Sequence, residues 1–111
     1  LLRRSDPAAE APCLRFGDFE LDVASRTLKR RDEEVSLTRT EFDLLATMAA
    51  RPRAAFTRRQ LIDAVWGPEW YGDEHVVDVH VGHLRRKLRD DAADPTYIRT
   101  VRGIGYGMVD R

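Results

Sequence analysis

The sequence predicts an α+β fold, in which an N-terminal antiparallel sheet is followed by three helices and a C-terminal β-hairpin. Three observations predict it: short β-favouring stretches before Leu37, two capping signatures that each open an amphipathic segment, and two strand-like stretches around glycines near the end. With 111 residues, 42% hydrophobic and 34% charged, the chain suits one compact domain. We expect a linker over residues 1–13 and the folded domain over residues 14–111.

The first part of the folded region is predicted to be a sheet of short strands. Over residues 14–37, β-favouring stretches alternate with polar turn candidates, which predicts three or four antiparallel strands, assigned here as a four-stranded sheet. Phe19, Leu21 and Val23 alternate with polar or small residues, so one face should pack on the helices and the other should meet water. Ahead of the sheet, residues 3–12 are rich in proline, alanine and charge, which favours a linker from a preceding domain of a longer protein.

Two helices are predicted from the same capping signature, a threonine followed three residues later by glutamate or glutamine. Thr38 with Glu41 opens a helix whose apolar positions recur at three- and four-residue spacing. Thr57 with Gln60 opens a second helix, which a glycine and a proline end. The predicted helices cover about residues 39–51 and 58–66.

The third and longest predicted helix begins at Asp73 or Glu74, with Asp73 as its candidate cap, and runs to Arg89. One face carries an apolar stripe for the core, formed by Val77, Val81, Leu84 and Leu88. On the opposite face, Val79 is apolar and Gly82 is unfavourable in a helix interior. A helix in the major groove explains both, because valine can touch a thymine methyl and glycine lets the backbone approach the bases. The alternative is that both are tolerated accidents of an exposed face.

Charge is unevenly distributed in a chain whose net charge is zero, with 19 basic and 19 acidic residues. Overall neutrality argues against a nucleic-acid-binding protein, which is expected to be basic. However, residues 80–89 carry four cations and no acid, whereas residues 60–74 carry four acids and no cation. The basic run fits either a solvated helix face or a nucleic-acid contact, and the acidic run is a poor contact for DNA.

The C-terminal stretch predicts two strands, over residues 97–102 and 106–109, joined by a glycine-containing turn. Its glycines form a GxGxG, but dinucleotide binding requires that motif between a parallel strand and a helix, so this one is a turn. Asp78 and His80 lie on different faces of their helix and have no serine or cysteine nucleophile beside them. We therefore expect no enzyme activity, and nothing in the sequence nominates a substrate.

No metal, cofactor or membrane span is expected. His75, His80 and His83 share one helix, but the first and the last are about 12 Å apart along its axis and cannot bind one ion. His80 and His83 alone would be half a site. No stretch approaches the roughly 20 apolar residues that cross a bilayer. The single cysteine, Cys13, cannot form an internal disulfide, which favours a reduced cytoplasm.

Four motifs, in order and at natural spacing, carry a resemblance to a known family. They are LTRTEFDLL (37–45), TRRQLIDAVWG (57–67), VVDVHVGHLRRKLR (76–89) and YIRTVRGIGYGMV (97–109). Over about residues 14–110 the chain strongly resembles the OmpR/PhoB-type winged-helix domain, the C-terminal DNA-binding effector of two-component response regulators. The resemblance implies a four-stranded N-terminal sheet, a three-helix core and a C-terminal hairpin called the wing, in the order predicted above from the residues.

The resemblance also implies which residues meet DNA. The third helix would read the major groove, and the wing would place Arg102 in the adjacent minor groove. Members of the family commonly carry arginine at the positions matching His75, Gly82 and His83, where this chain has none. The residues that match base contacts are His75, Val79, Gly82, His83 and Arg86. Those that match phosphate contacts are Arg58, His80, Arg85 and Thr100.

Partners follow from the same resemblance. The acidic connection over residues 67–74 matches the loop that contacts RNA polymerase, with Glu69, Trp70 and Tyr71 as its contact residues. The alternative is that one or both aromatic rings fold back on the core. Two copies are expected to bind tandem repeats in double-stranded DNA as a homodimer. A sensor histidine kinase would act through a receiver domain that precedes this chain.

Other functions stay open at the level of sequence. A winged helix could dock a protein with its third helix, and its binding would then hardly depend on salt. The same DNA-binding domain could also belong to a membrane-tethered activator or to an antibiotic-pathway regulator. We favour sequence-specific DNA binding by a bacterial response regulator, because four motifs in order are more specific than any one of them.

Overall fold

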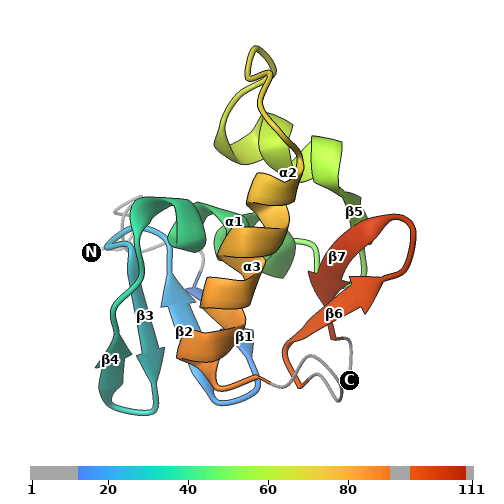
Figure 1. Cartoon of the computed structure of the whole chain (residues 1–111). Coiled ribbons are helices and arrows are strands. Elements are labelled where there is room, and N and C mark those ends of the chain that lie inside the picture. The colour runs from blue at the N-terminus through green and yellow to red at the C-terminus, as the bar shows by residue number, and fades with distance from the viewer. Residues whose placement is uncertain (1–12, 91–95, 110–111) are drawn as a thin grey trace. The chain divides into compact units, whose positions relative to one another are not determined.

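The computed structural model describes residues 13–90 and 96–109 (Figure 1). The chain divides after Ser36 into two compact units, which are described separately. The first unit is a sheet of four strands, and the second combines three helices with a sheet of three strands, which confirms the predicted α+β class. The helices of the second unit are α1 (Arg39–Ala49), α2 (Arg58–Val65) and α3 (His75–Leu88).

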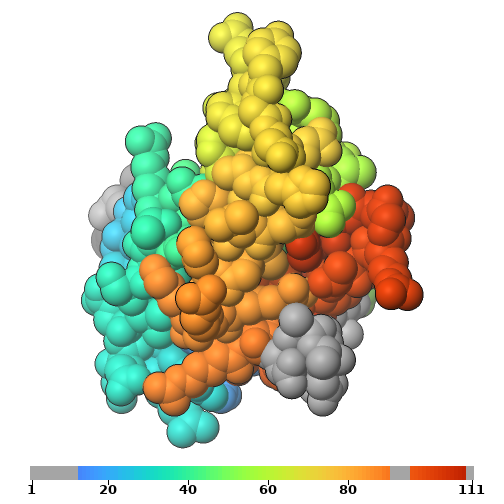
Figure 2. Space-filling view, viewed as in Figure 1, coloured from blue at the N-terminus to red at the C-terminus, as the bar shows by residue number. Residues whose placement is uncertain are grey.

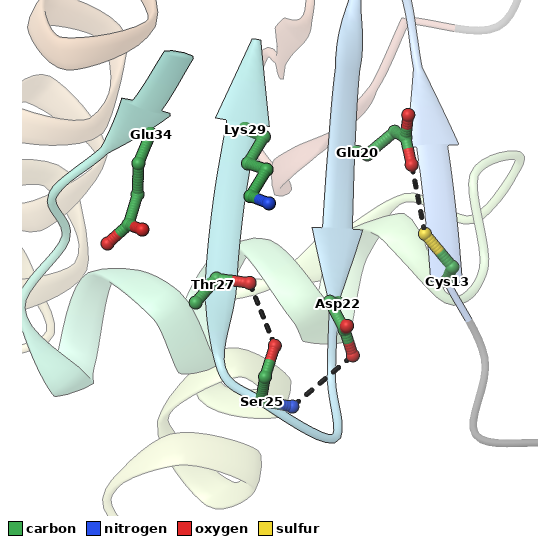
Figure 3. A pocket seen from close by; sticks show the side chains of 7 residues that line it. All are labelled: Cys13, Glu20, Asp22, Ser25, Thr27, Lys29 and Glu34. Atoms are coloured by element: carbon green, nitrogen blue, oxygen red, sulfur yellow. Dashed lines mark hydrogen bonds between the residues drawn. The ribbon is translucent and has the colours of Figure 1, made fainter. Parts of the chain in front are cut away.

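The first unit is an antiparallel sheet whose two faces differ in polarity. Its strands, in spatial order, are β1 (Cys13–Phe16), β2 (Phe19–Asp22), β3 (Thr27–Arg30) and β4 (Glu33–Val35). The register aligns Leu14, Leu21, Leu28 and Val35 in one row, and Arg15, Glu20, Lys29 and Glu34 in the next. Neighbouring rows point to opposite faces, and Leu21 and Leu28 are buried while Glu20 and Lys29 are exposed. The predicted alternation is therefore confirmed within β2, whereas Val23 lies in the turn that follows the strand. Figure 3 shows the polar face.

Both predicted capping boxes are present and start α1 and α2. The backbone N–H of Glu41 donates to the Thr38 hydroxyl, and the backbone N–H of Thr38 donates to the Glu41 carboxylate at 3.0 Å. Thr57 and Gln60 make the same two bonds. Each box satisfies two amides that a helix start would otherwise leave without partners. Both helices end one or two residues before the predicted boundary, where helix ends commonly fray.

The boundaries of α3 depend on local backbone hydrogen bonds. Glu74 precedes the helix, and its side chain does not cap it. Asp73, the predicted cap, instead accepts a hydrogen bond from the backbone N–H of His75 at 2.9 Å. At the other end Arg89 adopts φ 58°, the left-handed conformation in which helices commonly terminate. The predicted core stripe is confirmed, since each member is 0% exposed: Val77, Val81, Leu84 and Leu88.

The predicted C-terminal hairpin is confirmed, and it belongs to a larger sheet. β6 (Ile98–Val101) and β7 (Gly105–Met108) pair antiparallel, and β5 (Phe56–Thr57) pairs with the other edge of β7. The sequence did not predict β5, because two residues are too few to show an alternating pattern. A Cβ atom at Gly105 would collide with the carbonyl oxygen of Phe56, so glycine lets β5 and β7 approach.

We expect Gly105→Ala to lower the free energy of unfolding by about 2 kcal/mol or more, because β5 must move away from the added methyl group. Urea denaturation followed by circular dichroism measures this change. Gly82→Ala is the matched control. Nothing described lies within 4 Å of a Cβ at Gly82, so alanine should stabilise α3 by about 1 kcal/mol. Equal stability of Gly105→Ala and wild type would contradict the close contact between β5 and β7.

Candidate nucleic-acid interface

The outward face of α3 carries the five side chains predicted to contact bases. His75 and Arg86 are exposed, Val79 is 54% exposed, and the side chain of His83 is 44% exposed. The space above Gly82 is open for a close approach of another molecule. In the space-filling view this surface of α3 is uncovered, and the hairpin of β6 and β7 lies beside it (Figure 2). The helix therefore presents an arginine, two histidines, a glycine and an apolar side chain together to solvent.

Asp78 joins one flank of α3 to two other elements. Its Oδ1 atom accepts a hydrogen bond from Arg58 Nε of α2 at 2.9 Å and one from the Tyr106 hydroxyl of β7 at 2.5 Å. The Arg58 guanidinium also lies 5.5 Å from the centre of the Tyr106 ring. Burial, followed by the hydrogen bond to Asp78, raises the pKa of Tyr106. Arg58, predicted to contact a phosphate, is thus already paired with an acid inside the protein.

Arg85 connects the last turn of α3 to β6. Its guanidinium donates to the carbonyl oxygen of Ile98 at 3.0 Å and to the Thr100 hydroxyl at 2.8 Å. It also lies 5.6 Å from the centre of the Tyr106 ring, on which Arg58 stacks as well. Arg85 and Thr100, both predicted to contact phosphates, are therefore bonded to each other and fix the hairpin against the helix.

Glu41 joins the start of α1 to the C-terminal half of α3. It is only 2% exposed, and its Oε1 atom accepts hydrogen bonds from Lys87 Nζ at 2.6 Å and from the backbone N–H of Thr38 at 3.0 Å. Its Oε2 atom lies 3.8 Å from Nδ1 of His83. Burial by itself would raise the pKa of Glu41, but the hydrogen bonds from Lys87 and Thr38 outweigh it and lower the pKa.

His80 is part of a row of rings on α3 and the end of α2. Its ring centre lies 5.5 Å from that of Trp66 and 5.9 Å from that of His83. The Nδ1 atom of His80 is buried and has no hydrogen-bond partner among the described residues. His80, predicted to contact a phosphate, can therefore offer only Nε2 to a ligand.

The acidic connection between α2 and α3 exposes one of its two aromatic rings. Trp70 packs on Trp66, with ring centres 5.9 Å apart, and its carbonyl oxygen accepts a hydrogen bond from Arg59. Tyr71 is 89% exposed, and Glu69 is exposed beside it. The Trp70 ring therefore folds back onto the protein, whereas the Tyr71 ring is exposed. This is the alternative in which one of the two aromatic rings folds back.

The two ends of the candidate interface carry His75 and Arg102. His75 Nδ1 lies 2.9 Å from Asp73 Oδ1, and this hydrogen bond, together with the negative charge of Asp73, raises the pKa of His75. Arg102 is exposed in the turn between β6 and β7, which Gly103 permits with φ 75°. Both residues are thus accessible to a ligand that lies along α3 and the hairpin.

Sequence reasoning missed the groups that hold this surface in place. Asp78 was considered only for catalysis, Glu41 only as a capping residue, and Tyr106 and Lys87 were assigned no role. Tyr106 lies 28 residues from Asp78 in the chain, and Lys87 lies 46 residues from Glu41. Local sequence patterns cannot predict contacts between residues so far apart. The position of Glu41 in a capping box was the one available signal.

The described residues contain neither a candidate metal site nor a membrane-spanning helix. Within residues 13–90 and 96–109, histidine, cysteine, aspartate and glutamate side chains form no group of three or more that could hold a metal ion. None of the helices in these ranges combines the length and the apolarity required to cross a membrane.

Three helices with a β-hairpin beside the third define the winged-helix class of DNA-binding domains. The chain belongs to the family described as "Transcriptional regulatory protein, C terminal", which it matches over residues 32–108. This is a family of transcription regulators, and the chain is not an enzyme. The hairpin of β6 and β7 is the wing of this fold.

Similar proteins are bacterial response regulators. The chain is 47% identical over 108 residues to the phosphate regulon transcriptional regulatory protein PhoB of Rhizobium meliloti, covering 97% of this chain and 47% of that protein. It is 44% identical over 108 residues to the response regulator MprA of Mycobacterium tuberculosis, covering 96% and 46%. The chain thus spans about half the length of the curated relatives that it matches.

Two solved structures have the same fold. One is the RstA DNA-binding domain of Klebsiella pneumoniae in complex with the RstA box, with a TM-score of 0.80 and 32% identity over 87% of this chain and 96% of that one. The other is the DNA-binding domain of CpxR from E. coli, with a TM-score of 0.78 and 31% identity over 89% and 97%.

We expect Glu41 to stabilise the fold in a pH-dependent way. Because its pKa is lowered in the folded state, its contribution is present above its ordinary value of 4.5 and is lost as the pH falls through the folded value. At neutral pH Glu41→Gln should lower the free energy of unfolding by about 1 kcal/mol. This difference should shrink as the pH falls from about 7 to about 3 in urea denaturation.

The control for this measurement is Glu69→Gln, which removes an exposed acid from the α2–α3 connection. It should change stability little at any pH. A Glu41→Gln difference that stayed constant from neutral to acid pH would show that the Glu41 carboxylate is not stabilised in the folded protein.

Proposed function

We propose that this chain is the effector domain of a bacterial two-component response regulator and binds double-stranded DNA sequence-specifically. The observation that carries the proposal is the contrast along α3, whose inner stripe is 0% exposed while Val79 on the outer face is 54% exposed. A rigid helix that presents cations, a glycine and an apolar side chain suits the major groove. Family membership and the RstA domain bound to its box support the same function.

In this proposal the outer face of α3 contacts base edges, and the residues around it contact backbone phosphates, which fixes the orientation of the helix on the duplex. The wing turn places Arg102 in the minor groove, where a narrow A·T tract concentrates negative potential. The phosphate-contacting side chains are already held by bonds within the protein, so they lose little conformational freedom on binding. The base-reading set is His75, Val79, Gly82, His83 and Arg86. The phosphate set is Arg58, His80, Arg85 and Thr100.

The larger protein and its partners belong to the same proposal. Residues 1–12 would link this domain, whose first strand begins at Cys13, to a receiver domain that a sensor histidine kinase phosphorylates in the cytoplasm. Two copies would bind tandem repeats about one helical turn apart. Glu69 and Tyr71 would contact RNA polymerase, with Trp70 supporting the loop from below by its packing on Trp66.

We expect Arg102→Ala to weaken binding to an A·T-rich duplex about three- to tenfold and to reduce the salt slope of the affinity by about one. The reason is that the wing loses the cation that faces the minor groove. Fluorescence anisotropy titrations between about 50 and 200 mM salt measure both quantities.

Arg15→Ala is the charge-matched control for this titration. It removes an arginine whose side chain is 74% exposed on the four-stranded sheet, outside the proposed interface. Its affinity and salt slope should stay close to those of wild type. Wild-type affinity in Arg102→Ala would remove the wing from the interface. Binding by wild type that did not depend on salt would favour a protein-docking role instead.

A further inference from the structure

The surroundings of His83 differ on the two sides of its imidazole ring. On the protein side, Nδ1 lies 3.8 Å from Oε2 of Glu41, and the ring of His80 meets that of His83 edge-on. On the other side the ring is open to solvent, with 44% of the side chain exposed. Arg86 and Lys87 line the same hollow beside the helix as His83 and Glu41. One ring nitrogen therefore faces a buried acid, and the other is free to meet a ligand.

The second carboxylate oxygen of Glu41 favours a proton on the facing nitrogen. Oε1 already accepts hydrogen bonds from Lys87 Nζ and from the backbone N–H of Thr38. These bonds lower the pKa of Glu41 and favour the ionised carboxylate. An ionised carboxylate has no proton to donate, so Oε2 can only accept a hydrogen bond. A neutral imidazole beside it is most stable with its proton on Nδ1, because the opposite tautomer would point a lone pair at the acid.

We propose that Glu41 is a positioning residue for DNA reading, and that it holds His83 with Nδ1 protonated so that Nε2 is presented to the bases as a hydrogen-bond acceptor. This inference rests on the proposed function, in which His83 faces the major groove. An acceptor at this point selects a base that offers an amino group there, namely adenine through N6 or cytosine through N4. Guanine and thymine present acceptors to the same atom and are disfavoured.

The carboxamide in Glu41→Gln should reverse this arrangement. Lys87 and Thr38 both donate to the Oε1 position, so the amide oxygen of glutamine stays there. Its NH₂ group then takes the place of Oε2 and donates toward His83. The neutral ring accepts this bond at Nδ1 and moves its proton to Nε2, which becomes a donor toward the bases.

The first experiment needs no DNA. Nitrogen-15 NMR spectra of the imidazole rings report which nitrogen of a neutral ring carries the proton. We expect the proton of His83 on Nδ1 in wild type and on Nε2 in Glu41→Gln. Lys87→Gln is the control, because it removes the other partner of Glu41 and leaves Oε2 in place. A wild-type ring protonated on Nε2 would overturn the proposal.

The second experiment measures base preference by selecting bound duplexes from random DNA. The position read by His83 is the one whose preference is lost in His83→Ala. There, wild type should prefer adenine or cytosine by about tenfold, and Glu41→Gln should move the preference toward guanine or thymine. Lys87→Gln should weaken binding to all duplexes and leave the preference in place.

The outcomes separate the two proposals. An unchanged base preference in Glu41→Gln, although the proton has moved, would overturn the reading role of Glu41. Enrichment of no duplex by wild type would contradict the proposed function and the reading role together. A merely structural role of Glu41 predicts a loss of stability with neither a proton shift nor a change of preference.

Discussion

One carboxylate, that of Asp78, joins α3 to both α2 and the wing. A single oxygen of this residue accepts hydrogen bonds from Arg58 and Tyr106, which lie 20 and 28 residues away in the chain. These bonds bring the start of α2, the first half of α3 and the wing together. Hydrogen bonds to a charged group are stronger than neutral ones, and removing the acid would leave Arg58 without its counter-charge. The orientation of α3 toward the start of α2 and toward the wing depends on this contact.

Two further contacts complete the attachment of α3 and explain how a chain with zero net charge presents a basic surface. Arg85 binds β6, and Lys87 binds the buried acid Glu41 of α1. Acids are thus placed on the flanks of the helix, where they pair with cations inside the protein. Residues 79–89 of the chain contain no acid, and Arg86 and Arg89 are exposed. Local charge, and not net charge, determines whether such a surface attracts DNA.

Features encoded within a few residues were predictable, and features that join distant residues were not. Both capping boxes, the core stripe of α3 and the terminal hairpin follow from local spacing and were confirmed. β5 was missed because its two residues form a strand only through pairing with β7. The pairing of Arg58 with Asp78 and the packing of Trp70 on Trp66 also depend on tertiary structure. The sequence therefore predicted which residues form the candidate interface, but it did not predict the tertiary contacts that hold α3 and the wing in place.

The central claim is that the outer face of α3 and the tip of the wing contact DNA. Amide chemical-shift mapping of the nitrogen-15-labelled chain, titrated with a duplex recovered by random-sequence selection, tests it most directly. We expect the largest shifts at the outward positions between His75 and Arg86 and at Arg102, with small shifts in β1 to β4. Shifts concentrated in the four-stranded sheet, with α3 unchanged, would contradict it.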